Sequence, residues 1–571
     1  MTEGFDWVFH FLPAITKYHL LLVTLVGYVA TIGGYTAVFP VFAQYKPPAR
    51  CPTELDLNPN LSGLNFTFNE INDLTKVVQE PFKECEYYEM DFSSCPENQK
   101  DEFLQCARNL TKDTTLSCTA DEAIFDTSQF TSTVPTEFHL ACGSQLNGLA
   151  TSLSFIGLFI GAGTGGYMSD KYGRKTTIMV GIFLNGVGFL CQALVPSYAA
   201  FVFFRILVQG ANQAAYLTFT VYCCEIVGPE GRAYTGMIPN FTFAIGYMIM
   251  SWFSMLFPDW RQLTLFITAL TFPFLLTWWL WPESPRYLYQ SGKFEEAEKV
   301  MKHFFKKCGM NWGSEEAALL VNTEAAVLEK LKEKCKSQEK EESENSETSS
   351  VKTYSAIDLF RSGAPLAKTS LIICYQFIAI TCAYYGLSFG AGSLPGSVYL
   401  NNVINGAVEV IAYVIAFFLL NVIGRKALLT GPLIFSGSAM IIGMLLTKFV
   451  VGAWVPEVYR WLMFAGKLGV SCAFAVIWIY ASELFPTVVR TNAVGLGSMA
   501  GRIGGIVSPF ILEMGASIPW LPPLIFGTVT ISAGIALLAL PETLGMSMLN
   551  TIPDANEFYM KKNTKKSEIQ K

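Results

Sequence analysis

The chain has 571 residues, of which 51% are hydrophobic and only 15% are charged, and its formal net charge is −6. A charged fraction this low excludes an ordinary soluble protein, and the acidic net charge gives no reason to expect a nucleic-acid partner. The hydrophobic residues fall in runs of roughly 20, the length that a helix needs to cross a bilayer. We therefore predict an all-α membrane protein.

Twelve hydrophobic runs define the predicted spans. They lie at about 18–42, 144–167, 176–195, 199–224, 233–256, 262–281, 366–389, 397–421, 427–449, 458–481, 491–514 and 520–540. The resulting plan has an N-terminal segment 1–17, a six-helix bundle within 18–281, a connecting segment 282–365, a second six-helix bundle 366–540 and a tail 541–571. The first run follows Lys17 without a cleavage signal, so we expect it to remain as a span.

Basic residues gather in alternate connections between the spans. One side contains Lys171, Arg174, Lys175, Arg425, Lys426 and Arg490, together with the lysine-rich stretches 293–340 and 561–566. The connections 196–198 and 390–396 on the other side contain neither Lys nor Arg. Because cytoplasmic loops are enriched in Lys and Arg, we predict a multi-pass protein with both termini in the cytoplasm. We also expect a monomer in the plasma membrane.

The segment 43–143 is then extracellular. It contains six of the fourteen cysteines, Cys51, Cys85, Cys95, Cys106, Cys118 and Cys142. It also contains three sequons for N-glycosylation, at Asn60, Asn65 and Asn109. An even set of cysteines on an oxidising face predicts a disulfide framework, whose connectivity the sequence leaves open. The alternative is that these cysteines are free thiols, and their clustering with sequons argues against it.

The connecting segment 282–365 is cytoplasmic in this plan. Its stretch 292–305 has apolar residues at helical spacing and predicts a short amphipathic helix. The stretch 336–350 consists mostly of Ser, Glu and Lys and predicts a disordered linker between the two halves.

Three short motifs occur in the same order in both halves. The first contains Arg174 and then Arg425, the second pairs Glu225 and Arg232 with Glu483 and Arg490, and the third is Pro-Glu-Ser at 282–284 and Pro-Glu-Thr at 541–543. The offset is 251 from Arg174 to Arg425, 258 from Arg232 to Arg490 and 259 from Pro282 to Pro541. A nearly constant offset predicts a duplication of a six-helix unit.

These motifs carry a family resemblance. The stretch Gly-Tyr-Met-Ser-Asp-Lys-Tyr-Gly-Arg-Lys at 166–175 resembles the loop after the second span in the major facilitator superfamily. The stretches 282–288 and 482–490 and the cysteine-rich segment resemble its organic cation, organic anion and carnitine transporters, over about 18–550. Residues 405–413 and 466–502 are most similar to the carnitine/organic cation branch. The chain departs from that branch at Gly33, where relatives carry a cavity-lining asparagine, so the coupling ion, sodium or proton, is left open.

The charged motif residues predict an inner gate. Those expected to pair between the halves are Asp170, Arg174, Glu225 and Arg232 in the first half and Arg425, Glu483 and Arg490 in the second. Such pairs would form while the central site faces outward and would break when it opens inward. The alternative is that the charges only anchor the spans at the lipid headgroups.

Three ionisable residues lie within predicted spans, where a charge is costly and marks a ligand or ion path. They are Glu409 in the eighth span, Lys467 in the tenth and Arg502 in the eleventh. Arginine offers a planar fork that suits a carboxylate. A purely structural pair between Glu409 and Arg502, and a structural pairing of Lys467, are the alternatives.

The resemblance also implies an aromatic wall. Tyr216, Phe243, Phe474 and Trp478 match positions that surround an ammonium group in carnitine-type relatives, and Gln213 adds a polar group. Aromatic faces attract quaternary ammonium groups. An ammonium cage beside an arginine predicts alternating-access transport of carnitine-like zwitterions or organic cations. A polyspecific organic anion transporter is the alternative, and a non-transporting receptor is more remote. We found no pattern for an enzyme, a catalytic residue, a metal site or a cofactor.

Overall fold

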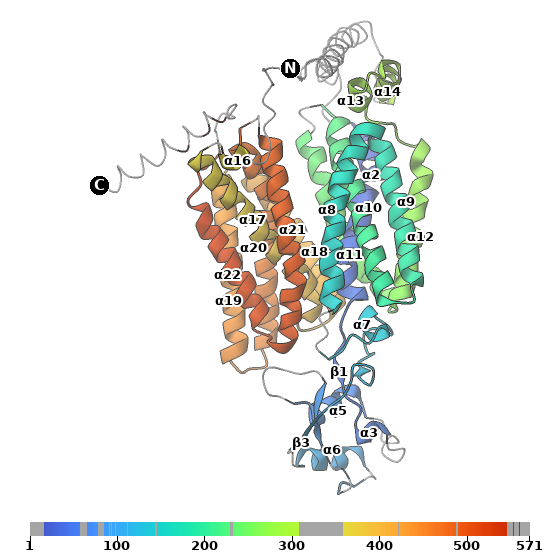
Figure 1. Cartoon of the computed structure of the whole chain (residues 1–571), viewed down its shortest axis with the longest axis vertical. Helices are drawn as coiled ribbons and strands as arrows, with labels where there is room; N and C mark the ends of the chain where they lie inside the picture. Colours follow the sequence, from blue (N-terminus) through green and yellow to red (C-terminus); the bar gives the residue numbers. More distant parts are fainter. Residues whose placement is uncertain are drawn as a thin grey trace, which may run out of the picture.

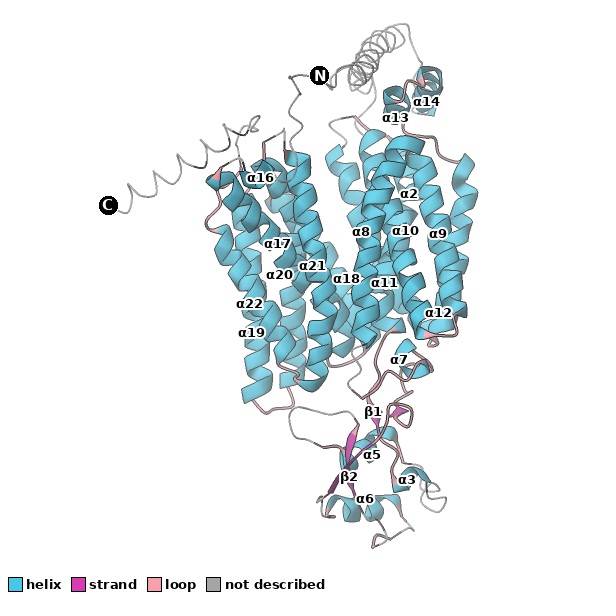
Figure 2. Cartoon of the chain, viewed as in Figure 1, coloured by secondary structure: helices cyan, strands magenta, loops and turns pink. Residues whose placement is uncertain are grey.

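The structure is a computed structural model, and it describes residues 16–57, 66–77, 85–142 (except 91, 93, 97, 98, 111 and 113), 146–228, 232–307, 358–544 (except 362, 421, 487 and 488), 552, 555 and 559. These described residues form two helical bundles and a small domain at one end of them (Figure 1). Strands occur only in that small domain among the described residues (Figure 2).

The first bundle consists of α2 (Lys17–Ala43), α8 (Leu146–Tyr172), α9 (Arg174–Leu194), α10 (Tyr198–Glu225), α11 (Arg232–Leu256) and α12 (Trp260–Thr271). The last of these continues directly into a 3-10 helix, η1 (Phe272–Trp279). This change of helix type falls at Pro273, which lacks the backbone N–H that an α-helix requires. The predicted sixth span is therefore one α-helix followed by a tighter 3-10 helix.

The second bundle consists of α17 (Ala364–Phe389), α18 (Val398–Leu419), α19 (Arg425–Phe449), α20 (Val455–Leu484), α21 (Arg490–Ser517) and α22 (Leu521–Leu537). A short 3-10 helix, η2 (Gly390–Ser393), follows α17, and α16 (Asp358–Arg361) precedes it. The two bundles meet through α8 with α21 and through α11 with α18 (Figure 1). A helix occurs at each of the twelve predicted positions, with ends that differ from the prediction by a few residues.

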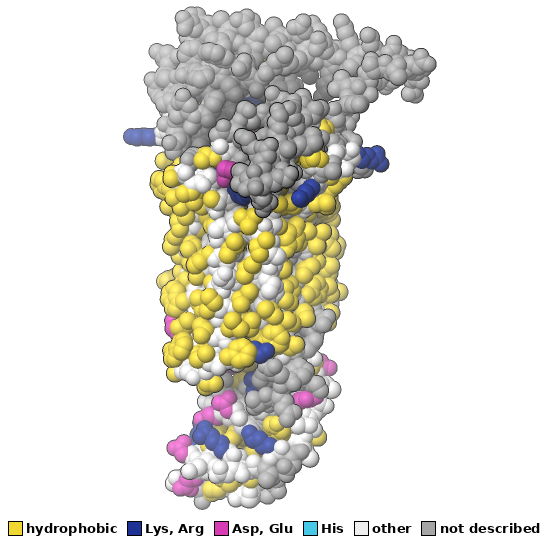
Figure 3. Space-filling view, turned by 90° about the vertical axis from the view of Figure 1, so that its left-hand side faces the viewer, with side chains coloured by type: hydrophobic (Ala, Val, Ile, Leu, Met, Phe, Trp, Pro, Cys, Tyr) yellow, Lys and Arg dark blue, Asp and Glu magenta, His cyan; other side chains and the backbone are white. Residues whose placement is uncertain are grey.

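The helical body has an apolar surface. Nine of its described helices are long and apolar enough to cross a bilayer, and α22 is a shorter apolar helix. Hydrophobic side chains cover the middle of the body, and the charged side chains in view gather mostly toward its two ends (Figure 3). The helix α10 is not among the nine because it carries polar residues, including the buried Arg205, Gln209 and Asn212.

The small domain is built from short elements: β1 (Ala49–Arg50), α3 (Glu54–Leu57), α5 (Phe68–Thr75), β2 (Glu86–Glu89), α6 (Lys100–Arg108), β3 (Thr114–Ser117), β4 (Ile124–Phe125) and α7 (Val134–Glu137). The strands form two antiparallel pairs, β1 with β4 and β2 with β3. We call the end of the molecule that carries this domain the disulfide end, and the opposite end the motif end.

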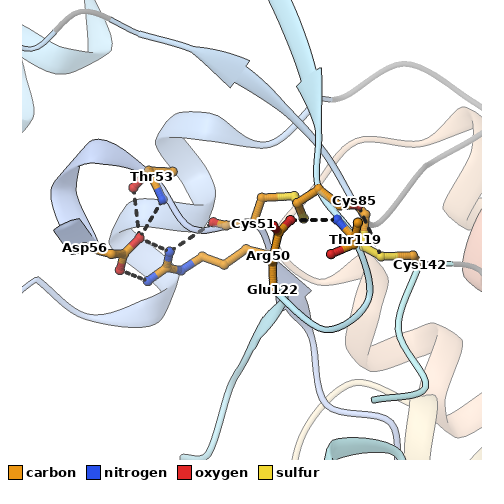
Figure 4. The surroundings of a disulfide bond; sticks show 9 residues. Arg50, Cys51, Thr53, Asp56, Cys85, Thr119, Glu122 and Cys142 are labelled. Atoms are coloured by element: carbon orange, nitrogen blue, oxygen red, sulfur yellow. Dashed lines mark hydrogen bonds and ion pairs between the residues drawn. A yellow bond between two sulfur atoms is a disulfide. The ribbon is translucent and has the colours of Figure 1, made fainter.

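The six cysteines of this domain form three disulfides, which are Cys51–Cys118, Cys85–Cys142 and Cys95–Cys106. An ion pair between Arg50 and Asp56 lies beside the first bridge, with 2.6 Å between Nη1 and Oδ2 (Figure 4). Burial alone would raise the pKa of Asp56, but hydrogen bonds from Arg50 and Thr53 lower it overall. Asn109 is exposed at the end of α6, whereas Asn60 and Asn65 lie outside the described residues.

The disulfides should differ in their contribution to stability. Cys51–Cys118 closes a separation of 67 residues and Cys95–Cys106 one of 11. Because longer loops lose more chain entropy on closure, we expect the Cys51→Ser/Cys118→Ser variant to cost about 4 kcal/mol and the Cys95→Ser/Cys106→Ser variant about 3 kcal/mol. Urea unfolding of the purified protein, followed by proteolysis of this domain, measures both. The opposite ranking would contradict the loop-length argument.

At the motif end, α13 (Pro285–Gln290) and α14 (Phe294–Lys307) follow the first bundle. The apolar side chains Ala297, Met301, Phe304 and Phe305 share one buried face of α14. The Phe304 ring packs against Tyr18 at the start of α2, with 5.3 Å between ring centroids. The predicted linker 336–350 lies outside the described residues.

Candidate functional site

The duplicated motifs form two matching clusters at the motif end. In the first bundle, α9 begins after Gly173, whose φ of +100° favours glycine, and the Glu283 carboxylate accepts the backbone N–H of Arg174 at 3.0 Å. In the second bundle, α19 begins after Gly424, whose φ is +91°, and the Glu542 carboxylate accepts the backbone N–H of Arg425 at 2.9 Å. The sequence repeat is therefore also a repeat of side-chain geometry.

The arginine side chains complete the clusters. Arg174 Nη2 lies 2.9 Å from Glu225 Oε1 at the end of α10, and Arg425 Nη2 lies 3.0 Å from Glu483 Oε1 at the end of α20. Asp170 adds an exposed contact of 3.2 Å to Arg174. Each of these ion pairs lies within one bundle. For Asp170, Arg174, Glu225, Arg425 and Glu483, the pairs seen in this conformation are thus within the bundles and not between them as the sequence predicts.

Two predicted gate residues remain, Arg232 and Arg490. The side chain of Arg232 lies outside the described residues. Arg490 donates its Nε–H to the Phe485 carbonyl at 3.4 Å, within the second bundle.

The described residues that join the two bundles explain why those five residues pair within their own bundles. Ser152 Oγ of α8 donates to the Ile506 carbonyl of α21 at 2.7 Å, and the Gly148 N–H donates to Glu513 Oε2 at 3.1 Å. Phe155 packs edge-on against Tyr385 of α17, with 4.7 Å between ring centroids. These contacts lie toward the disulfide end, since α8 begins and α21 ends there. The two bundles therefore contact each other toward the disulfide end in this conformation.

The two acidic partners of Arg174 should contribute differently to stability. The Glu225 side chain is 10% exposed and that of Asp170 is 79% exposed. We expect Glu225→Gln to cost about 3 kcal/mol, because it leaves a nearly buried guanidinium without its main partner. Asp170→Asn should cost less than about 1 kcal/mol, because water screens an exposed pair. Thermal melting of the purified variants measures both, and equal losses would contradict this assignment.

Near the middle of the second bundle, Glu409 and Lys467 form a fully buried ion pair. Both side chains are 0% exposed, and Lys467 Nζ lies 3.7 Å from Glu409 Oε2. The hydroxyls of Tyr384 and Tyr413 both donate to Glu409 Oε1 at 2.5 Å. Lys467 Nζ also donates to Ser388 Oγ at 2.6 Å. The carboxylate is therefore held by a lysine and two tyrosines.

This arrangement replaces the Glu409–Arg502 pair that the sequence left open. Arg502 is half-buried and has neither an ion pair nor a hydrogen bond to the described part of the chain. It lies within electrostatic range of Tyr385. Since Lys467 neutralises Glu409, the half-buried guanidinium of Arg502 is the charge that this region leaves accessible among the described residues.

Aromatic rings extend from the buried pair in the second bundle. Tyr384 stacks on Phe474, with 4.7 Å between centroids, and Phe474 contacts Trp478 edge-on at 6.4 Å. Trp478 is 36% exposed and also packs edge-on against Phe377. Phe474 and Trp478 thus lie on one face of α20, as their spacing of four residues predicts.

The first bundle supplies a second aromatic pair. Tyr216 of α10 and Phe243 of α11 pack edge-on with 6.0 Å between centroids. Gly33 of α2 lies against both rings. A Cβ built on Gly33 would lie 3.5 Å from Tyr216 and 3.6 Å from Phe243, which is an ordinary van der Waals contact. The Tyr216 hydroxyl lies within electrostatic range of Glu409 in the second bundle. Gln213 is half-buried on the same helix.

Sequence reasoning missed Tyr384, Tyr413 and Ser388. Tyr413 lies four residues after Glu409 on α18, a spacing that does indicate a contact on one helical face. Tyr384 and Ser388 share a face of α17, but no local signal connects that helix with α18 or α20. Only the packing of the bundle shows that they hold Glu409 and Lys467.

Comparison with known proteins agrees with this architecture. The family described as "Sugar (and other) transporter" matches residues 90–552. The chain belongs to this transporter family. The "Organic cation transporter protein" of Drosophila melanogaster is 30% identical over 98% of this chain and 95% of its own length. The "Organic cation/carnitine transporter 2" of Homo sapiens is 31% identical over 75% of this chain and 72% of its own length.

A solved structure also shows the fold. The "Inward open conformation of the xylose transporter XylE from E. coli" has a TM-score of 0.57 and 15% identity, covering 94% of this chain and 99% of its own. Another structure of that transporter is described as a member of the major facilitator superfamily and has a TM-score of 0.52 with 17% identity. The chain is therefore a multi-pass membrane transporter of the organic cation/carnitine type, with the major facilitator fold, and is not an enzyme.

Proposed function

We propose that this transporter moves carnitine-like zwitterions or organic cations by alternating access across the plasma membrane, with the disulfide end outside and the motif end in the cytoplasm. The observation that carries the proposal is the half-buried Arg502, which lies within electrostatic range of Tyr385. The Tyr385 ring contacts Tyr384 edge-on with 5.3 Å between centroids, and Tyr384 stacks on Phe474 of the aromatic wall. Lys171, Lys175 and Lys426 at the motif end and the disulfides at the other end support the orientation.

The charge of the site favours a substrate with a carboxylate. Glu409 and Lys467 neutralise one another, so the charge left in this part of the second bundle is Arg502, within electrostatic range of Tyr385. A guanidinium fork binds a carboxylate through two parallel hydrogen bonds. The rings of Tyr216, Phe474 and Trp478 can face a quaternary ammonium group. A zwitterion with both groups satisfies the arginine and the aromatic wall together.

Organic anions are the second candidate. The same neutralisation of Glu409 removes the acid that would repel them, and Arg502 would attract them. They differ from zwitterions in lacking the ammonium group that the aromatic faces attract. A receptor that does not transport is the remote alternative.

Uptake by cells that express the chain tests these candidates. The assay compares three labelled compounds: carnitine, tetraethylammonium and a monocarboxylate without an ammonium group. Each is measured in sodium medium and in medium whose sodium is replaced by N-methylglucamine. We expect carnitine to be taken up fastest. Faster uptake of the monocarboxylate would favour the anion transporter, and faster uptake of tetraethylammonium would contradict the role of Arg502. No uptake of any compound by chains at the cell surface would favour the receptor.

A further inference from the structure

The helices α11 and α18 approach closely across the two bundles near the disulfide end. The close approach depends on Gly406 of α18, because a Cβ there would lie 2.5 Å from Met248 Cγ and 3.2 Å from Tyr247 Cδ1, both on α11. Tyr247 is 2% exposed. The contact is therefore tight, and it must separate if the transporter opens toward the disulfide end.

Asn402 of α18 joins the bundles through two hydrogen bonds. It is 0% exposed, and its Nδ2 donates to the Tyr247 carbonyl at 3.1 Å and to Ser251 Oγ at 2.7 Å. Its neighbour Asn401 is also 0% exposed, but the Asn401 Nδ2 donates to carbonyls of its own bundle, including that of Leu394 at 3.1 Å. Both asparagines thus donate buried hydrogen bonds. Those of Asn402 run between the bundles, whereas those of Asn401 stay within the second bundle.

The Tyr247 hydroxyl adds a second connection. It donates to the Ser388 carbonyl of α17 at 3.4 Å and accepts from Asn405 Nδ2 at 3.3 Å. The Asn405 Nδ2 also donates to the Leu387 carbonyl at 3.2 Å. The Oγ of Ser388 accepts the hydrogen bond from the buried Lys467 ammonium. One tyrosine of the first bundle therefore contacts the segment that holds the charged pair of the second.

A cavity of about 660 Å³ lies on the disulfide side of this contact. Its lining includes Asn405 and Leu387 together with Gln44, Gly148 and Glu513. Asn405 therefore lies at the wall of this cavity, while Tyr247 and Asn402 are buried behind it.

We propose that Tyr247, Asn402 and Asn405 form a polar latch, a set of hydrogen bonds that holds the two bundles together at the disulfide end. In this proposal Tyr247 is a positioning residue, because its hydroxyl also contacts the segment of Ser388 that binds Lys467. The proposal rests on the alternating access proposed above. When the bundles part, water replaces these hydrogen bonds, so each contributes only its net free energy to the closed state. Loss of one such bond shifts the ratio of closed to open gates by about five-fold.

Chemical labelling measures this shift. The reporter is Met248→Cys, which places a thiol at the contact with Gly406, and the reagent is a membrane-impermeant maleimide added outside cells. In the reporter background we expect Tyr247→Phe to raise the labelling rate about five-fold. The matched control is Tyr28→Phe, since the Tyr28 hydroxyl donates to the Leu270 carbonyl at 3.0 Å within one bundle. The chain without Met248→Cys gives the background from its other cysteines.

A second pair of variants keeps the test informative if one of them folds poorly. Asn402→Ala removes two bonds between the bundles and should raise the labelling rate by about ten-fold or more, whereas Asn401→Ala should leave it unchanged. Labelling rates are normalised to protein at the cell surface. Equal rates in Tyr247→Phe and Tyr28→Phe, or in Asn402→Ala and Asn401→Ala, would overturn the latch. Labelling requires no substrate, so the result stands apart from any error in the proposed substrate.

Discussion

Glu409→Gln destabilises the folded transporter by about 3–5 kcal/mol, because it leaves the ammonium of Lys467 buried without a counter-charge. Lys467→Met has a similar effect by isolating the Glu409 carboxylate. Both side chains are 0% exposed, so water screens neither charge. Thermal melting of the purified variants and their yield at the cell surface measure the loss.

The double variant Glu409→Gln/Lys467→Met recovers most of this stability, because replacing a whole buried ion pair by neutral groups is often neutral or stabilising. Lys448→Met is the matched control, since Lys448 is exposed near the disulfide end and its loss should change stability by less than about 0.5 kcal/mol. A double variant that is no more stable than either single variant would show that the two side chains do not form a pair.

Uptake by the double variant then separates two roles for Glu409. A purely structural pair predicts that a stable double variant still transports, since neither side chain is exposed. A direct contact with the ammonium group of the substrate predicts a stable variant that no longer transports. The buried position of Glu409 leads us to expect transport to persist.

The helical framework was predictable from sequence because spans of about 20 apolar residues and a repeat at nearly constant offset are local or periodic signals. The partner of Glu409 was not. Lys467 and Arg502 both lie within spans, and choosing between them requires the rotation of α18, α20 and α21 about their axes. Hydrophobic pattern fixes such rotations only roughly, because buried helices are apolar on most sides.

The gate residues show a second limit of sequence. The motif repeat indicates that Arg174 and Arg425 hold equivalent places, and the structure shows matching clusters around them. Under the alternating access proposed above, whether their partners lie in the same bundle or in the other depends on which end of the transporter is closed. One sequence encodes both conformations, so it cannot specify which set of pairs a single structure contains.

Arg502→Ala lowers the uptake of carnitine by about 100-fold or more, because it removes two charge-assisted hydrogen bonds to the substrate carboxylate. Arg502→Lys keeps the positive charge but loses the planar fork, so it should lower uptake by only about ten-fold. Neither variant should change the melting temperature much, since Arg502 is half-buried and has no ion pair among the described residues. Radiolabelled uptake normalised to surface protein measures both losses.

The control for this prediction is Ile503→Ala, because Ile503 is the next residue of α21 and is 54% exposed. It tests whether any truncation at this turn of the helix impairs transport, and we expect uptake close to that of the unaltered chain. Tetraethylammonium should respond differently from carnitine to the loss of Arg502, because it has no carboxylate to bind Arg502 and is repelled by the guanidinium. Its uptake should stay low or rise in Arg502→Ala. If carnitine uptake is unchanged in a well-expressed Arg502→Ala variant, Arg502 does not bind the carboxylate and the zwitterion proposal is wrong.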